Sequence, residues 1–243
     1  MLSVVGRRKE DIAMKRKLFM LIFLCVSTVL TFTHLSLAYE ENFDKGKAEG
    51  WKDTSAGKSW VTEEGAYHQP DAAPVNVFAF YAINDSKWKD YTFEVQIRPI
   101  TASNYAGVLF RVKAAGAGGT SWATGDFLYW LIGIGGNYSK VWDAPSGKAV
   151  DETPGDTLKP GEWNDVKVVA KAKEFVMYLN GKEQKKYTDE SGKHDFGGIG
   201  LATYNADAFF DNVKAEGPGL PGMAVNLTGK LTITWGGLKF YDR

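Results

Sequence analysis

Residues 161–182 read GEWNDVKVVAKAKEFVMYLNGK, which is the pattern of two strands followed by a tight turn. Every second position is apolar in each strand-like run, the period of a strand that buries one face. The dipeptide Asn180-Gly181 can adopt the positive φ angles of a two-residue hairpin turn. Residues 182–187 are therefore predicted to fold back as an antiparallel partner, and the chain is predicted to be all-β.

Three more segments carry strand patterns and indicate which faces are buried. In residues 91–98 apolar and polar side chains alternate, so one face is expected in the core and the other, with Glu94, in water. The same alternation over residues 107–112 places Arg111 on the wet face, beside Glu94 if the two strands pair. Residues 127–134 are apolar on both faces, which predicts a central strand covered on both sides.

Several short motifs follow one another along the chain: WVTEEGAY at 60–67, YTFEVQIR at 91–98, GVLFR at 107–111, GGIGLA at 197–202 and FFDNVK at 209–214. Together with the hairpin they resemble the concanavalin A-like (laminin-G-like) jelly roll. Within that superfamily they resemble the bacterial 3-keto-disaccharide hydrolase domain, which is grouped with family 16 glycoside hydrolases. The resemblance covers residues 39–217. It implies a two-sheet antiparallel β-sandwich.

The N-terminal segment has the order of a secretory signal peptide. Residues 15–17 are basic and residues 18–26 are apolar. The small residues Ser36 and Ala38 then stand at the two positions that a signal peptidase reads before Tyr39. An uncleaved membrane anchor is the alternative, but the apolar run is shorter than the about 18 to 20 residues that a span needs. We therefore expect a secreted or periplasmic protein with no membrane contact after cleavage.

Three regions are expected along the chain. Residues 1–38 form an N-terminal extension and signal peptide, residues 39–217 the jelly roll, and residues 218–243 a linker and strand-like tail. The tail either packs back on the sandwich or serves as an attachment or export signal. Met14 is a more natural start than Met1. Because the single cysteine precedes the expected cleavage site, the mature protein would contain no disulfide.

The charge balance disfavours several classes of ligand. Lys and Arg together number 29, as do Asp and Glu, so neither nucleic acid nor a polyanionic partner is favoured. The glycine-rich loop at residues 114–125 is not followed by a phosphate-binding lysine, which argues against a nucleotide. A neutral ligand fits this composition best.

Aromatic residues are abundant, with 8 Trp and 11 Tyr, and they favour a carbohydrate ligand. Sugars present apolar C–H faces that pack on flat rings, and hydroxyl groups that need amide, carboxylate or guanidinium partners. The candidate binding residues are Glu94, Arg111, Trp122, Tyr129, Trp130, Tyr138, Trp142 and Tyr204. The alternatives are core packing for the rings and a cross-strand ion pair for the two charges. Trp51 and Trp163 are assigned to packing.

Catalysis is the less favoured function. Retaining glycosidases need two carboxylates about 5 Å apart, and the Glu-x-Asp-x-(x)-Glu pattern of the resembling family does not occur in the chain. His68 and His194 lie in polar segments and are expected on the surface. We predict a non-catalytic module that binds an oligo- or polysaccharide. A glycoside hydrolase of the resembling family and a structural or adhesion module at the cell surface are the alternatives.

The resemblance also implies a structural Ca²⁺ ion. Asp211 matches by motif the last-strand aspartate that holds calcium in related jelly rolls, and Asp44 is close to the first-strand position. Calcium requires about six to eight oxygen ligands, of which these side chains supply few. The alternative is that Asp211 accepts hydrogen bonds from backbone amides.

Overall fold

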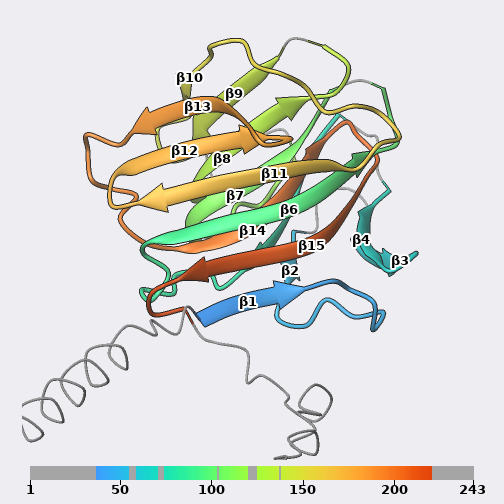
Figure 1. Cartoon of the computed structure of the whole chain (residues 1–243), viewed down its shortest axis with the longest axis horizontal. Coiled ribbons are helices and arrows are strands. Elements are labelled where there is room, and N and C mark those ends of the chain that lie inside the picture. Colours follow the sequence, from blue (N-terminus) through green and yellow to red (C-terminus); the bar gives the residue numbers. More distant parts are fainter. Residues whose placement is uncertain are drawn as a thin grey trace, which may run out of the picture. The chain divides into compact units, whose positions relative to one another are not determined.

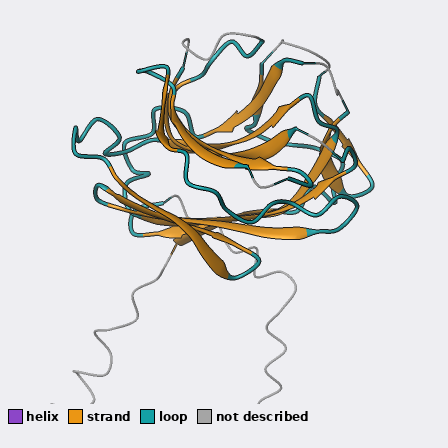
Figure 2. Cartoon of the chain, turned by 90° about the horizontal axis from the view of Figure 1, so that it is seen from above, coloured by secondary structure: helices purple, strands orange, loops and turns teal. Residues whose placement is uncertain are grey.

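The computed structural model describes residues 37–220, except residues 55–58, 71–73, 103, 120–124 and 137. Within these residues the chain forms two antiparallel sheets, of eight and seven strands, that pack face to face as a β-sandwich (Figure 1, Figure 2). This confirms the predicted all-β, two-sheet fold. Residues 1–36 of the predicted signal peptide, residues 221–243 of the predicted tail and Trp122 lie outside the described residues. Leu37 and Ala38, the last two residues of the predicted signal peptide, pair with the strand that ends at Gly217. The described residues contain no helix that is long and apolar enough to cross a membrane.

The strands are divided between the sheets in a jelly-roll order. The first sheet contains, in spatial order, β13 (Lys182–Thr188), β12 (Glu174–Leu179), β11 (Asn164–Lys171), β6 (Tyr91–Pro99), β15 (Ala208–Gly217), β4 (Ala66–Gln69) and β3 (Val61–Glu63), with β1 (Leu37–Glu41) paired to β15. The second sheet contains β10 (Lys148–Asp151), β9 (Ser139–Asp143), β8 (Asp126–Gly133), β7 (Tyr105–Ala114), β14 (Gly198–Tyr204), β5 (Asn76–Tyr81) and β2 (Lys52–Asp53).

The hairpin predicted from residues 161–182 is present in the first sheet. β11 pairs with β12, and β12 with β13, in antiparallel register. Asn180 (φ 50°) and Gly181 (φ 77°) form the turn, because a two-residue hairpin loop of this hand needs positive φ at both positions. In β6, buried and half-buried positions alternate along the strand. The outer face of the first sheet is therefore open to water, as predicted.

β8 is buried on both faces, as its apolar sequence predicts. Trp130 and Ile132 lie in the core between the sheets, while Phe127 and Tyr129 belong to a smaller cluster on the outer face of the second sheet. Gly116, in the loop before β8, packs closely on Phe127, since a Cβ at this glycine would lie 3.3 Å from the ring. Loop residues therefore cover part of the outer face of the second sheet.

Arg111 does not lie where the alternation predicted. β6 and β7 are in different sheets, and the register of β7 shifts at a bulge in which Arg111 has a φ of 56°. A bulge inserts one residue, so the side chains beyond it change face. Arg111 is fully buried, and its guanidinium donates hydrogen bonds to the carbonyl oxygens of Trp88 (3.3 Å) and Ala172 (3.1 Å). The prediction that Arg111 shares a wet face with Glu94 is wrong.

Candidate functional site

Three tyrosine rings lie side by side on the outer face of the second sheet. Tyr105 of β7 is in register with Tyr204 of β14 and with Gly133 of β8, and Gly133 N–H donates to the carbonyl oxygen of Tyr138 (2.7 Å). Residues paired in register share a face, so the three rings meet. Their centroids are 5.6 Å (Tyr105 to Tyr204) and 5.0 Å (Tyr105 to Tyr138) apart. We call Tyr138, Tyr105 and Tyr204 the tyrosine row.

Tyr129 lies next to the tyrosine row but is fully buried. Burial, and the nearby phenols of Tyr105 and Tyr138, raise the pKa of Tyr129 well above its usual range. Gly107 makes room for it, because a Cβ at this position would lie 3.1 Å from the Tyr129 ring and would collide with the backbone oxygen of Trp130. Tyr129 therefore supports the row and cannot offer a ring face to a ligand.

Lys140 of β9 places a positive charge beside the tyrosine row. Its Nζ lies 5.2 Å from the ring centre of Tyr138 and 5.7 Å from that of Trp142, within cation–π range. It also forms an ion pair with Glu152 (2.5 Å). Partial burial lowers the pKa of Lys140, but hydrogen bonds with Glu152 and Tyr138 outweigh it and the net shift is upward. The row thus has a charged pair at its side that can hydrogen-bond to hydroxyl groups.

The structure brings some of the predicted rings together and separates others. Tyr138 and Tyr204 lie in the tyrosine row, with Trp142 beside Lys140. Tyr105 joins them, although it was not among the candidates predicted from the sequence. The sequence could have identified Tyr105, because a residue two positions before Gly107 lies on the same face of the strand as Gly107. Trp130 is fully buried in the core between the sheets, so it belongs to the scaffold and not to an open groove.

Glu94 lies on the other side of the sandwich. It belongs to β6 on the outer face of the first sheet, where Lys167 Nζ is 4.0 Å from its carboxylate. Because the outer faces of two stacked sheets point away from each other, Glu94 and the tyrosine row cannot contact the same short ligand. The predicted cross-strand ion pair of Glu94 is therefore made with Lys167, and not with Arg111.

The two histidines expected on the surface are buried. His68 belongs to β4, and its two ring nitrogens contact the carboxylates of Glu63 and Asp207. The side chain of His194 is 1% exposed, with Nε2 3.4 Å from Asp143 Oδ1. Carboxylates supply the polar partners that an imidazole needs to leave water, and the sequence pattern around each histidine does not contain these distant partners. The surface prediction is wrong for both.

Of the two tryptophans assigned to packing, one is exposed. Trp51 is buried as predicted, and its Nε1–H donates to the Tyr39 hydroxyl (2.9 Å). Trp163 is 40% exposed, and its ring lies 5.0 Å from the guanidinium carbon of Arg98. Trp163 therefore packs on the Arg98 side chain at the surface and not in the core.

Asp44 and Asp211, the predicted calcium ligands, lie close enough for their charges to interact. Burial, and to a lesser extent the Asp44 carboxylate, raise the pKa of Asp211. Asp211 Oδ1 accepts a hydrogen bond from the backbone N–H of Asn212 (2.6 Å), which is the alternative to calcium binding. No group of three or more His, Cys, Asp or Glu side chains that could hold a metal occurs in the described part of the chain. Calcium would need backbone oxygens for most of its ligands, and its binding stays a prediction.

Comparison of the sequence with known proteins finds a family and two relatives. The model of the family described as 3-keto-alpha-glucoside-1,2-lyase-like domain matches residues 38–216. An extracellular exo-alpha-L-arabinofuranosidase from Streptomyces chartreusis is 28% identical over 153 residues, which are 62% of this chain and 17% of that protein. A levanase from Bacillus sp. (strain L7) is 25% identical over 183 residues, which are 74% of this chain and 18% of that protein. The chain therefore spans less than a fifth of the length of either relative.

Comparison of the fold finds similar solved structures. The carbohydrate binding module CBM66 from Bacillus subtilis has a TM-score of 0.55 at 17% identity, over 69% of this chain and 96% of that chain. A protein of unknown function with a galectin-like fold, also from Bacillus subtilis, has a TM-score of 0.56 at 10% identity, over 73% of this chain and 94% of that chain. At these identities the likeness concerns the fold alone. With the family match, it identifies a carbohydrate-related β-sandwich domain.

Proposed function

Since the chain belongs to the 3-keto-alpha-glucoside-1,2-lyase-like domain family, we propose that it is an exported module that binds an oligo- or polysaccharide without cleaving it. The tyrosine row is the proposed binding site. The observation that carries the proposal is the contact of three tyrosine rings across neighbouring strands, with centroids 5.0 and 5.6 Å apart and Tyr138 36% exposed.

The energetics of such a surface suit a binding module. Burying about 40 to 60 Å² of a sugar face on each ring, at about 25 cal/mol per Å², contributes about 1 to 1.5 kcal/mol. Three rings and a few hydrogen bonds, including those available from Lys140 and Glu152, would give about 4 to 6 kcal/mol. This corresponds to a Kd between about 1 mM and tens of micromolar.

The relatives support a binding role within larger proteins. Both are named for enzymes that act on carbohydrates, yet this chain corresponds to only 17% and 18% of their lengths. A domain of that share is better suited to holding a polysaccharide than to supplying the whole active site. One of the two is named extracellular, which supports export of this chain by the predicted signal peptide.

Cleavage of the saccharide is the second candidate function, because the family is described as lyase-like. General acid–base catalysis would need a proton-transfer group within hydrogen-bond reach of the bound sugar. His68 is a ring whose two nitrogens contact carboxylates, those of Glu63 and Asp207. However, its side chain is 8% exposed, and it belongs to the first sheet, away from the tyrosine row. This geometry favours binding over cleavage.

One experiment separates the two functions. The exported protein is applied to an immobilised panel of neutral polysaccharides that includes levan and α-L-arabinofuranose polymers, and each retained glycan is then incubated with the protein and assayed for released reducing sugar. We expect retention without product release above background. Steady product release that His68→Gln abolishes would favour the enzyme, and failure to retain any neutral glycan would contradict the proposed function.

A further inference from the structure

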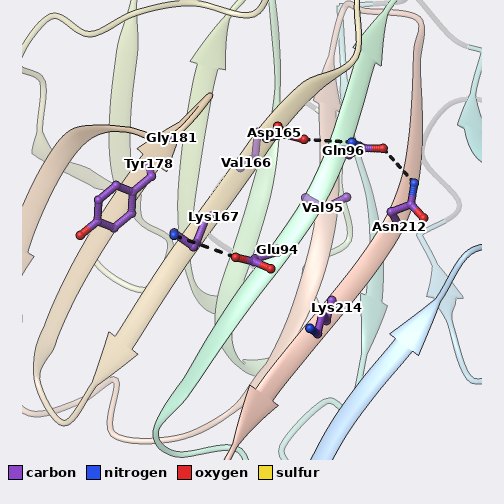
Figure 3. A pocket seen from close by; sticks show the side chains of 10 residues that line it. All are labelled: Glu94, Val95, Gln96, Asp165, Val166, Lys167, Tyr178, Gly181, Asn212 and Lys214. Atoms are coloured by element: carbon purple, nitrogen blue, oxygen red, sulfur yellow. Dashed lines mark hydrogen bonds and ion pairs between the residues drawn. The ribbon is translucent and has the colours of Figure 1, made fainter.

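The outer face of the first sheet carries an open groove that the tyrosine row does not use. The groove has a volume of about 430 Å³ and is lined by residues of β6, β11, β12 and β15 (Figure 3). A second hollow of about 540 Å³ adjoins it over β15 and β1 and shares Asn212 and Lys214 with it. The two hollows adjoin on the side of the sandwich opposite the tyrosine row, and most of the side chains that line them end in charged or amide groups.

One row of side chains follows the groove across five strands. Tyr178, Lys167, Glu94, Lys214 and Glu40 are consecutive partners in the register of β12, β11, β6, β15 and β1. Neighbouring strands lie about 4.8 Å apart, so the row is about 19 Å long. That length suits several sugar units in line better than a single one.

A second row runs parallel to the first and is built from amides. Gln96 Nε2 donates to Asp165 Oδ1 (2.9 Å), and Asn212 Nδ2 donates to Gln96 Oε1 (2.8 Å) (Figure 3). Asn212 lies in a bulge of β15, where the register shifts between Asp211 and Lys214, and it has a φ of 50°. Bulges redirect side chains, and they are frequent next to functional sites. Here the bulge directs the Asn212 amide toward Gln96.

The charges that line the groove are close to balance. In the first hollow Glu94 and Asp165 are opposed by Lys167 and Lys214, of which Lys214 also pairs with Glu216 (2.6 Å). The adjoining hollow adds Glu40, Glu41 and Lys45. The surface therefore carries no large excess of either charge and favours neither polyanions nor polycations. Lys167 Nζ and Glu94 Oε1 are 4.0 Å apart, longer than a hydrogen bond, so both retain capacity for a ligand. The Tyr178 ring, 4.7 Å from Lys167 Nζ, supplies an apolar face at one end. A neutral ligand with many groups that both donate and accept hydrogen bonds matches this lining.

We propose that this groove is a second saccharide-binding site, which takes a neutral oligosaccharide laid across the strands. The proposal goes beyond the function of the tyrosine row and stands on separate residues. Two sites on opposite faces of one domain would let it contact two glycan chains, or two segments of one chain. A polysaccharide that reaches both sites would then bind more tightly than a short oligosaccharide, because its second contact is intramolecular.

The test uses NMR of the described domain within the full mature chain, with the side-chain amides of Gln96 and Asn212 as reporters. The probes are short oligosaccharides of levan and of α-L-arabinofuranose, together with any glycan retained on the panel. We expect the Gln96 and Asn212 signals to shift on titration. The amide of Asn164, which is buried against backbone carbonyl groups, serves as the internal control and should not move.

Variants separate this proposal from the tyrosine row. Tyr178→Ala and Gln96→Ala should each raise the Kd of the groove by about tenfold. The side-chain amide of Asn212 reports this Kd in both variants, and the Tyr105 response should be unchanged. Two half-exposed positions are used so that one variant remains if the other fails to fold. Tyr105→Ala should leave the Gln96 response in place. Loss of all binding in Tyr105→Ala, or a Gln96 signal that stays still while Tyr105 responds, would overturn the second site alone. No response in either set of residues with any probe would overturn both sites.

Discussion

The outer faces of the two sheets differ in how much water reaches them. In β6 of the first sheet every second residue is half-buried, whereas in β8 of the second sheet every residue after Asp126 is buried. Loops cover part of the second sheet, and the tyrosine row lies where its outer face meets solvent. The first sheet instead carries charged and amide side chains along an open groove.

This difference indicates what each face can do. Partly desolvated rings gain free energy from each square ångström of sugar that they cover, so the tyrosine row supplies affinity. Hydrogen bonds exchanged with water add little net free energy, but unmatched ones are costly, so the polar groove is suited to selecting among ligands. One sandwich thus presents an aromatic surface and a polar surface on opposite sides.

The largest effect on stability is expected in the core between the two sheets, at Trp130. Its ring fills the core, and truncation of a buried tryptophan removes about 3 to 5 kcal/mol of the free energy of unfolding. We expect Trp130→Ala to lose this amount in urea denaturation. Trp163→Ala, on the outer face of the first sheet, is the matched control and should lose less than about 1 kcal/mol. Equal losses would contradict the placement of Trp130 in the core and of Trp163 at the surface.

The next effect concerns calcium beside β15 of the first sheet. If the ion binds only the folded protein through Asp44 and Asp211, saturation at about a hundredfold above its Kd should stabilise the fold by about 2.7 kcal/mol. The measurement is thermal unfolding in chelator and in millimolar calcium. The same melting temperature in both would exclude a structural calcium ion and leave Asp211 bonded to its backbone amide.

The third effect is confined to the second sheet. Tyr105→Ala removes the central ring of the tyrosine row and should cost about 1 to 1.5 kcal/mol of glycan binding, or about tenfold in Kd. Isothermal titration with a retained glycan measures it. Trp163→Ala should bind like the unmodified protein, since its ring belongs neither to the tyrosine row nor to the lining of the groove on the first sheet. An unchanged Kd in folded Tyr105→Ala would exclude the row as a stacking surface.

The smallest effect is the pH dependence contributed by Asp211. Because burial raises its pKa in the folded state, the folded state binds a proton there more readily than the unfolded state does. This contribution to stability is fully present below the unfolded pKa of about 3.9 and is lost as pH rises through the folded pKa. In chelator, Asp211→Asn should therefore unfold at higher urea than the parent at pH 7 and with less pH dependence between about pH 4 and 6. A variant that is less stable at neutral pH in chelator would contradict this sign.

The fold could be predicted from short patterns because turns and strand alternation depend on residues that are close in sequence. The Asn180-Gly181 turn needs only two residues with positive φ, and the alternation of β6 needs only its own sequence. Arg111 escaped prediction because one inserted residue at the bulge reverses the face of the side chains beyond it. The alternation of apolar and polar residues does not reveal such an insertion.

The candidate site was predicted only in part because its residues meet across strands that are distant in sequence. Tyr138 and Tyr204 were identified as rings, but their contact depends on Tyr105, which pairs with a strand about a hundred residues later. His68 was misplaced for the same reason, since Asp207 reaches it from the loop before β15. Composition indicates the chemistry of a ligand, whereas strand order decides which side chains share a face.

The central claim, that the tyrosine row binds the saccharide, is tested most directly by following individual rings in the unmodified protein. NMR signals of Tyr105, Tyr138, Tyr204 and the Trp163 indole are recorded while a retained glycan is titrated. We expect the three tyrosine signals to shift together with one Kd, while the Trp163 signal does not follow them. A glycan that binds while all three tyrosine signals stay still would contradict the claim.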